Sequence, residues 1–195
     1  MKTIELEKKL MIDRSIYEFL VSCFEANAPK HIRHINYYYD TNEEYLRQDN
    51  ITCRIRQKED KLIGTIKKHC FVNGCPQNTE ETFSVKNLPA CFEVMQQIVI
   101  LKGSMVTDRT EIQLSADMLL VLDKNTYLGT VDYELEIEFG ERGNQEAEGV
   151  LKLFEKLFDI ERNHENILSK SERFFRKLES LPGQALLTVG KEKYD

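Results

Sequence analysis

The 195-residue sequence contains no apolar run that approaches the roughly 20 residues a membrane-spanning helix requires. Its N-terminus alternates charged and apolar residues, whereas a secretory signal would place a basic stretch before an apolar core. Internal repeats, low-complexity stretches and long linkers are also missing. These absences exclude a membrane protein, favour a cytoplasmic location, and predict one domain over residues 1–180 followed by a tail at 181–195.

Cysteine is scarce and irregularly spaced. The five are Cys23, Cys53, Cys70, Cys75 and Cys91. A chain of this length does not need disulfides, so free thiols are expected. Cys70 and Cys75 lie near His69, but no second pair supplies the other ligands of a zinc site. His31 and His34 have no acidic neighbour, and a surface position is expected for both.

An excess of positive charge is absent, because 27 Lys and Arg face 33 Asp and Glu, for a formal net charge of −6. Binding to a nucleic-acid backbone depends on many uncompensated cations, so nucleic acid is a poor candidate partner. A small anion in a local basic pocket remains compatible with this composition. The distribution of charge is therefore more informative than its sum.

Alternation of apolar and polar residues predicts a mainly β protein of the α+β class. The eight expected strands are 2–11, 34–41, 51–58, 61–69, 79–85, 105–114, 118–124 and 131–139. Four helices are expected: one from Asp13 to Pro29, one from Pro89 to Gly103, one from Asn144, and one that begins with a capping box of Ser169 and Glu172. Short connections between strands imply antiparallel pairing.

Charge alternates with apolar residues in the first and last expected strands. Glu5, Glu7 and Lys9 share one face of the first strand. The last strand places four acids on one face: Asp132, Glu134, Glu136 and Glu138. Like charges repel across such a face unless a cation is bound, and Mg²⁺ or Mn²⁺ takes carboxylate ligands.

The middle strands carry the opposite charge. Arg54, Arg56 and Lys58 share a face of one strand, Lys67 lies in the next, and Arg109 follows further along. Such side chains suit phosphate oxygens. A sheet with one solvated face would also alternate in this way, but it would mix both signs more evenly. The segregation favours an inward polar face with a metal on one wall, a polyanion on the other, and amphipathic helices outside.

The sequence resembles the CYTH family, the triphosphate tunnel metalloenzymes, which include class IV adenylate cyclases, thiamine triphosphatases and inorganic triphosphatases. The resemblance spans most of the chain. It rests on E-x-E-x-K at 5–9, YYYDT at 37–41, CRIRQ at 53–57, GTIKK at 64–68, LLVLDKNTYLG at 119–129, YELEIEF at 133–139 and SKSERF at 169–174. One such element alone is weak, but seven in order are specific.

The resemblance implies an eight-stranded antiparallel closed β-barrel, a tunnel with a charged interior and helices packed outside. By position, the metal ligands or their supports would be Glu5, Glu7, Asp123, Glu134, Glu136 and Glu138. The phosphate clamp would be Lys9, Arg54, Arg56, Lys67, Arg109, Lys170 and Arg173. Glu81 matches a further acid of the tunnel.

The function expected from these residues is metal-dependent hydrolysis of inorganic triphosphate or a small organic triphosphate, such as thiamine triphosphate or a nucleoside triphosphate, with Mg²⁺ or Mn²⁺ as cofactor. Lys67, or Lys9, would take the proton of the attacking water. Two alternatives stay open: a class IV adenylate cyclase that forms cyclic AMP and pyrophosphate, and a non-catalytic polyphosphate- or nucleotide-binding module. The sequence also leaves open whether the protein is a monomer or a homodimer.

Overall fold

The structure is a computed structural model that describes residues 2–72, 75–141, 143–162 and 168–182. The side chains of residues 2–5, 70–72 and 75–78 lie outside this description. The predictions for the side chains of Glu5, Cys70 and Cys75 and for the tail beyond 182 therefore fall outside the described residues.

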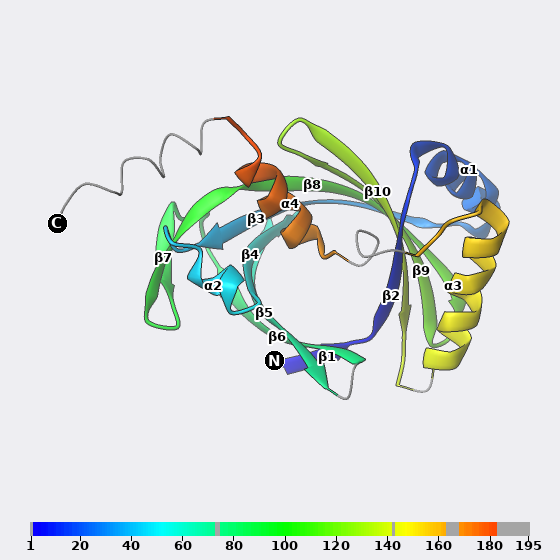
Figure 1. The fold of residues 1–195 in the computed structure, drawn as a ribbon, viewed down its shortest axis with the longest axis horizontal. Coiled ribbons are helices and arrows are strands. Elements are labelled where there is room, and N and C mark those ends of the chain that lie inside the picture. The colour runs from blue at the N-terminus through cyan, green and yellow to red at the C-terminus, as the bar shows by residue number, and fades with distance from the viewer. Residues whose placement is uncertain (1, 73–74, 142, 163–167, 183–195) are drawn as a thin grey trace.

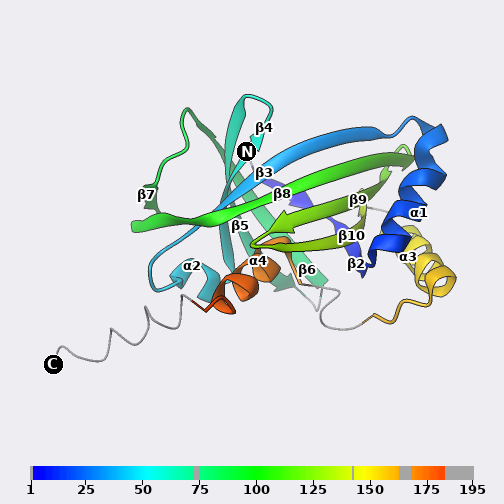
Figure 2. The ribbon, with the colours of Figure 1, turned by 90° about the horizontal axis from the view of Figure 1, so that it is seen from above.

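One antiparallel sheet of ten strands dominates the molecule and curves around its concave face (Figures 1 and 2). The strands are β1 (Lys2–Glu5), β2 (Glu7–Ile12), β3 (Lys30–Asp40), β4 (Ile51–Lys58), β5 (Lys61–Val72), β6 (Cys75–Val85), β7 (Cys91–Val94), β8 (Gln97–Ser115), β9 (Met118–Tyr127) and β10 (Thr130–Phe139). Their order is β1-β6-β5-β4-β3-β8-β9-β10-β2, with β7 attached to β8.

The sheet is not a closed eight-stranded barrel, and that prediction was wrong. The expected first strand is interrupted at Leu6, and its two halves lie at opposite edges of the sheet. β1 pairs with β6, β2 pairs with β10, and no ladder joins β1 to β2 within the described residues. β1 and β2 follow each other along the chain without a turn, so they cannot lie antiparallel and form a ladder with each other. Both are therefore edge strands, and the hydrogen bonds between the described strands do not form a closed ring.

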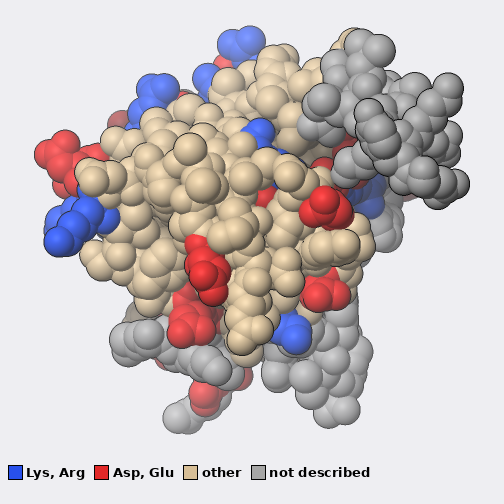
Figure 3. All heavy atoms as spheres, turned by 90° about the vertical axis from the view of Figure 1, so that its left-hand side faces the viewer, with Lys and Arg blue, Asp and Glu red and all other residues tan. Residues whose placement is uncertain are grey.

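The helix predicted from Pro89 to Gly103 is also wrong, because this segment forms β7 and the start of β8. Met95 and Gln96 have positive φ values of 51° and 64° and form the two-residue turn between the strands. The alternation that follows buries Val94 and Val99 and exposes Met95 and Ile98. The surface on this side of the molecule is largely uncharged (Figure 3).

The helices are α1 (Arg14–Phe24), α2 (Tyr45–Gln48), α3 (Asn144–Phe158) and α4 (Lys170–Glu179), with a 3₁₀ turn η1 at Glu25–Asn27. The predicted start of α1 is confirmed, since Asp13 accepts a hydrogen bond from the Ile16 backbone N at 2.8 Å. The capping box of Ser169 and Glu172 is likewise present at α4. Among the described helices, none combines the length and the apolar character needed to cross a bilayer.

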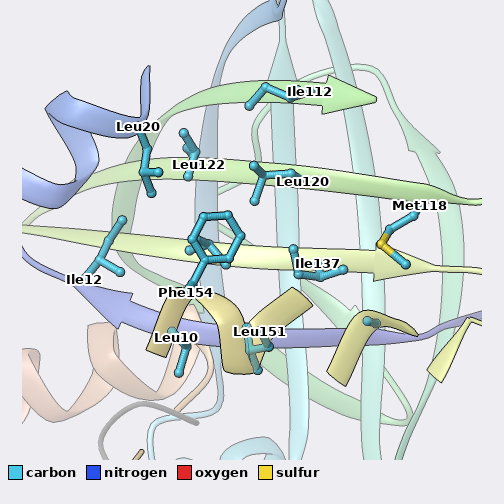
Figure 4. Close-up of a cluster of buried hydrophobic side chains, with 12 residues drawn as sticks. Leu10, Ile12, Leu20, Ile112, Met118, Leu120, Leu122, Ile137, Leu151 and Phe154 are labelled. Atoms are coloured by element: carbon cyan, nitrogen blue, oxygen red, sulfur yellow. The ribbon is translucent and has the colours of Figure 1, made fainter. Parts of the chain in front are cut away.

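Helices α1 and α3 cover the convex face of β2, β9 and β10 (Figures 1 and 4). Strand residues such as Leu122 and Ile137 pack there against Leu20 of α1 and against Leu151 and Phe154 of α3. This core confirms that the apolar faces of these strands point outward and are covered by amphipathic helices. Their polar faces consequently point toward the concave side.

Helix α4 does not lie outside the sheet as predicted, because it packs on the concave side. Its Phe174 and Phe175 contact Tyr38 of β3 and cluster with Met105 of β8. Gly103 permits this approach: a Cβ there would lie 2.8 Å from Phe174 Cζ, and its φ is +151°. The packing brings the N-terminus of α4 to the charged part of the concave face.

Candidate active site

Three acidic side chains from β9 and β10 form a buried group, called here the acid cluster: Asp123, Glu134 and Glu136. Asp123 lies opposite Glu134 in the ladder, and Glu136 follows on the same face. Their exposed fractions are 0, 0 and 4%. Carboxylates buried this deeply need compensating cations or hydrogen-bond donors.

Lys170, the first residue of α4, is one such cation. Its Nζ lies 3.0 Å from Asp123 Oδ2, 3.0 Å from Glu134 Oε2 and 2.7 Å from Glu136 Oε1. Burial opposes the charge of Lys170, but the three carboxylates outweigh it and raise the pKa of the ammonium. A cation at a helix N-terminus also runs against the helix dipole. The acid cluster therefore accounts for the position of this lysine.

Arg109 of β8 is a second cation held by the acid cluster. Its Nε and Nη2 donate to the two carboxylate oxygens of Asp123 at 2.9 and 2.8 Å. It also donates to Glu136 at 2.9 Å and to Glu138 at 3.1 Å. Burial disfavours the charge, yet the carboxylates raise the pKa of Arg109 well above its ordinary value. The guanidinium is thus neutralised by three acids.

Arg173 of α4 lies behind the acid cluster and does not line the pocket, although the sequence assigned it to the phosphate clamp. Its guanidinium donates to Glu134 at 2.5 Å, to Asp132 at 2.9 Å and to the Leu168 carbonyl at 2.8 Å. Asp132 also accepts hydrogen bonds from Asn125 and Tyr127. These contacts give Arg173 the role of holding α4 and Glu134 in place.

The facing strands β4 and β5 carry three cations that line the pocket: Arg54, Arg56 and Lys67. Lys67 Nζ lies 3.1 Å from Glu80 Oε1, and Arg54 Nη2 lies 3.8 Å from the same oxygen. The Nε of Arg54 is buried without a hydrogen-bond partner among the described residues. Arg56 donates from Nε to the Asn36 amide oxygen at 3.0 Å. Among the described side chains, the cations that line this part of the pocket therefore outnumber Glu80, the acid that Arg54 and Lys67 contact.

Glu80, and not Glu81, is the acid that β6 turns toward the pocket. Glu80 lies opposite Lys67 in the β5–β6 ladder and is 6% exposed, whereas Glu81 is exposed on the other face. The sequence presented two adjacent glutamates in a strand of weak alternation. Only the register against Lys67 distinguishes them.

Strand β2 lies beside β10 and contributes one acid, Glu7, and one cation, Lys9, to the lining of the pocket. Lys9 Nζ lies 3.4 Å from Glu134 Oε1. Burial raises the pKa of Glu136 to about 7; Lys170 opposes this shift. The nearby carboxylates of Glu134 and Glu7 add to it.

These side chains line one pocket on the concave face. Its described lining residues are Glu7, Lys9, Tyr38, Thr52, Arg54, Arg56, Lys67, His69, Arg109, Glu136, Glu138, Ser169, Lys170 and Ser171. The structure thus brings together most of the predicted site residues from five strands and α4. Asp123 and Glu134 stand directly behind this lining, in contact with Lys170.

Several residues of the site were missed from the sequence. Thr52 is hydrogen-bonded to His69 at 3.2 Å and to Ser171 at 2.9 Å, which links β4, β5 and α4. His34 was expected at the surface, but it is 3% exposed. Asn36, two residues further on β3, is fully buried. These neutral polar residues share strand faces with charged residues, so the alternation pattern alone does not identify them as part of the site.

The acidic side of the pocket fits a hard divalent cation by its donor chemistry. Among the described residues no three His, Cys, Asp or Glu side chains are already grouped as metal ligands. However, Glu134 Oε1 is buried and makes no hydrogen bond to a described residue. The Glu7 carboxylate is close enough to Glu136 to contribute to the raised pKa of Glu136. Carboxylate oxygens of this kind are the ligands that Mg²⁺ and Mn²⁺ prefer.

The sequence and the structure of this chain are similar to those of several known proteins. The chain is 29% identical over 167 residues to the "Putative triphosphatase YjbK" of Bacillus subtilis (strain 168), covering 77% of this chain and 86% of the relative. A crystal structure of a putative adenylate cyclase from Bacillus halodurans is 26% identical with a TM-score of 0.69, over 89% of this chain and 98% of the other.

A third similar protein is a putative adenylyl cyclase from Hippeastrum, described as having a dominant triphosphatase activity. It superimposes with a TM-score of 0.68 at 18% identity, over 93% of this chain and 98% of the other, and this likeness concerns the fold. The CYTH domain model matches residues 3–175. This match includes the described strands, apart from Lys2 at the start of β1, and the residues that line the pocket, so the chain belongs to the CYTH domain family.

Proposed function

We propose that the protein is a divalent-metal-dependent phosphohydrolase that acts on inorganic triphosphate or a small organic triphosphate. The observation that carries the proposal is the charge arrangement of the pocket. Carboxylates of β2, β9 and β10 face Arg54 and Arg56, with Lys67 beside them. Arg54 has its acidic contact, Glu80, at 3.8 Å, and Arg56 donates to a neutral amide. A metal-bound polyanion would satisfy both sides at once.

In this proposal the triphosphate lies against the basic side. Arg54 and Arg56 offer guanidinium donors to its oxygens, and Lys67 and Lys9 offer compact charges. Arg109 and Lys170 lie between the two sides and would adjust their contacts when a polyanion enters. Tyr38 is the single Phe, Tyr or Trp among the described lining residues, which favours a ligand that is mostly phosphate over one with a large ring system.

Glu7, Glu134 and Glu136 would hold Mg²⁺ or Mn²⁺. Asp123 and Glu138 would support them, as would Glu5, which is assigned from the family pattern alone. The metal would supply positive charge to the phosphate oxygens during attack on phosphorus. Arg109 and Lys170 keep the carboxylates oriented toward the pocket.

Water is the proposed nucleophile, and Lys67 is the proposed acceptor of its proton, with Lys9 as the second candidate. Lys67 can accept this proton only as the neutral amine, so its own proton must first move to the Glu80 carboxylate, whose Oε1 lies 3.1 Å from Lys67 Nζ. The ammonium that forms when Lys67 takes the proton of water then supplies positive charge to the phosphate. The expected location of this activity is the cytoplasm.

The test is a phosphate-release assay over inorganic triphosphate, thiamine triphosphate and ATP, each with Mg²⁺ and with Mn²⁺. Glu7→Gln and Arg56→Ala should each lower kcat/KM by more than about tenfold, because each removes a charge that contacts the bound substrate or metal. The matched control Glu25→Gln alters an exposed acid of η1 and should leave the rate unchanged.

Cyclic AMP and pyrophosphate are measured in the same reactions. Their formation from ATP would replace the proposal by an adenylate cyclase, the activity suggested by the name of the Bacillus halodurans protein. Binding of triphosphate without any turnover would indicate a non-catalytic module. Full activity of both variants would refute the proposed site.

A further inference from the structure

Arg56 is held by a neutral partner, unlike the other deeply buried cations of the site. It lies opposite Asn36 in the β3–β4 ladder, and its Nε donates to Asn36 Oδ1 at 3.0 Å. Arg109, Lys170 and Arg173 instead each contact two or more carboxylates. Arg56 forms no ion pair with a described residue.

No described carboxylate forms an ion pair with the Arg56 guanidinium, although Asp123 favours its charge from a greater distance. Burial lowers the pKa of Arg56 to about 9, and the neighbouring cations Arg54 and Arg109 add to this effect. The guanidinium still carries its proton at neutral pH, but it does so at a free-energy disadvantage that a bound anion would relieve. We therefore expect a negatively charged ligand to bind favourably at the Arg56 guanidinium.

Asn36 is itself unusual. It is completely buried, and its Nδ2 has no hydrogen-bond partner among the described residues. A buried amide group left unsatisfied destabilises the fold, so an apolar side chain would be the simpler solution for packing alone. An aspartate would have the same size and would pair with Arg56, but it would also neutralise it.

We propose that Asn36 is a positioning residue for phosphate binding: it orients the Arg56 guanidinium through Nε without neutralising it, so that both terminal nitrogens remain for the anion. This inference rests on the proposed function, since it assigns the anion to the triphosphate of the same pocket. A fork of two nitrogens fixed in one plane is the arrangement that grips phosphate oxygens most specifically.

The decisive variant is Asn36→Asp, which keeps the shape and adds one negative charge. Binding of inorganic triphosphate is measured by calorimetry in the presence of a chelator, and the melting temperature of the ligand-free protein is measured in parallel. We expect the melting temperature to rise, because Arg56 gains an ion pair, while Kd rises at least about tenfold. In steady-state assays KM should rise and kcat should change little.

A purely structural role predicts a different pattern, in which stability and affinity fall together or neither changes. Gln57→Glu is the matched control: it adds the same charge one residue from Arg56, on the opposite face of β4, where Gln57 accepts from the Tyr37 hydroxyl at 3.0 Å. Its Kd should stay within about twofold of the wild-type value, because the new charge is more exposed and screened.

A double-mutant cycle tests whether Asn36 acts through Arg56. In an Arg56→Met background, Asn36→Asp should cause no further loss of affinity. If Asn36→Asp does not fold, Asn36→Ser replaces it in the same cycle, since the shorter side chain cannot reach Arg56 Nε.

The outcomes separate the two proposals. A wild-type protein that neither binds nor hydrolyses triphosphate contradicts the proposed function. A wild-type protein that binds it, together with an Asn36→Asp variant of unchanged affinity, overturns the inference alone. Equal loss of affinity in both backgrounds also overturns it, because Asn36 would then act independently of Arg56.

Discussion

At the scale of single residues, the neighbours of each buried cation define what it can do. Arg173 is saturated by Asp132, Glu134 and a carbonyl oxygen, so it stabilises the structure behind the pocket. Lys170 is bound by three carboxylates, while Arg56 is bound by one amide. A cation that is already neutralised attracts an anion less, so we expect an anion to bind more strongly on the side of Arg56 than beside Lys170.

The contacts of Lys170 predict how its removal affects stability. Lys170→Met leaves buried carboxylates of the acid cluster uncompensated, and the free energy of unfolding measured by urea denaturation with a chelator should fall by about 3–5 kcal/mol. Addition of Mn²⁺ should recover part of this loss, because a bound cation can neutralise the same oxygens.

Lys152→Met is the control for Lys170→Met. Its side chain is 69% exposed and lies 3.9 Å from Glu148, so this substitution should have little effect on unfolding. Similar losses in the two lysine variants would show that the buried contacts of Lys170 contribute nothing beyond a surface pair.

At the scale of elements, α4 connects the packing of the concave face with the pocket. Its apolar residues pack on Tyr38 and Met105, and its first residue reaches the acid cluster. Arg47 of α2 contacts Glu179 at the other end of α4. The position of Lys170 therefore depends on how the whole helix is seated on the concave face.

Gly103→Ala tests this seating. The new Cβ would lie 2.8 Å from Phe174 Cζ at a φ of +151°, so the Phe174 ring must move. Because this ring also packs on Tyr38, we expect α4 to move with it. We expect a loss of about 1–3 kcal/mol in the free energy of unfolding and a lower kcat/KM for triphosphate, since Lys170 moves with the helix.

Gly149→Ala in α3 is the control, because nothing lies within 4 Å of its Cβ position. This variant should be about 0.5–1 kcal/mol more stable with unchanged activity. Normal stability and activity of Gly103→Ala would mean that the contact with Phe174 does not position α4.

At the scale of the whole molecule, the site gathers charged side chains in one pocket on the concave face, whereas the face in Figure 3 is mostly uncharged, with acidic and basic side chains scattered over it. This concentration brings buried titratable groups with it, and they affect the stability of the entire sheet. His34 is 3% exposed on β3. Burial lowers its pKa to about 3, with Arg56 and Arg109 acting in the same direction.

His34 is predicted to make the protein less stable in acid. The unfolded residue binds a proton near pH 6.5 and the folded one only near pH 3, so the unfolded state takes up more protons between these values. The contribution of His34 to the free energy of unfolding is complete above about pH 6.5 and decreases as the pH falls. At about pH 5 the decrease should be about 1–2 kcal/mol.

Urea unfolding of wild type and His34→Gln at about pH 7 and about pH 5 measures this contribution. Carboxylates titrate in both proteins, so the difference between their losses isolates His34. The variant should lose less stability than the wild type. Equal losses in the two proteins would contradict a buried neutral histidine.

Local patterns in the sequence were sufficient for much of the fold. Alternation identified most strands, the caps of α1 and α4 followed from Asp13, Ser169 and Glu172, and the convex core followed from the apolar faces. The hairpin at Met95 and Gln96 was missed because neither residue is typical of a two-residue turn.

The sequence by itself determined the polarity of each strand face, and so it predicted the acids of β10, the cations of β4 and the family. Three features were decided by tertiary structure. The N-terminal strand divides between the two edges of the sheet, α4 packs inside it, and register selects Glu80 over Glu81. Alternation depends on neighbours along one strand, whereas register, sheet closure and helix seating depend on contacts between residues distant in the chain.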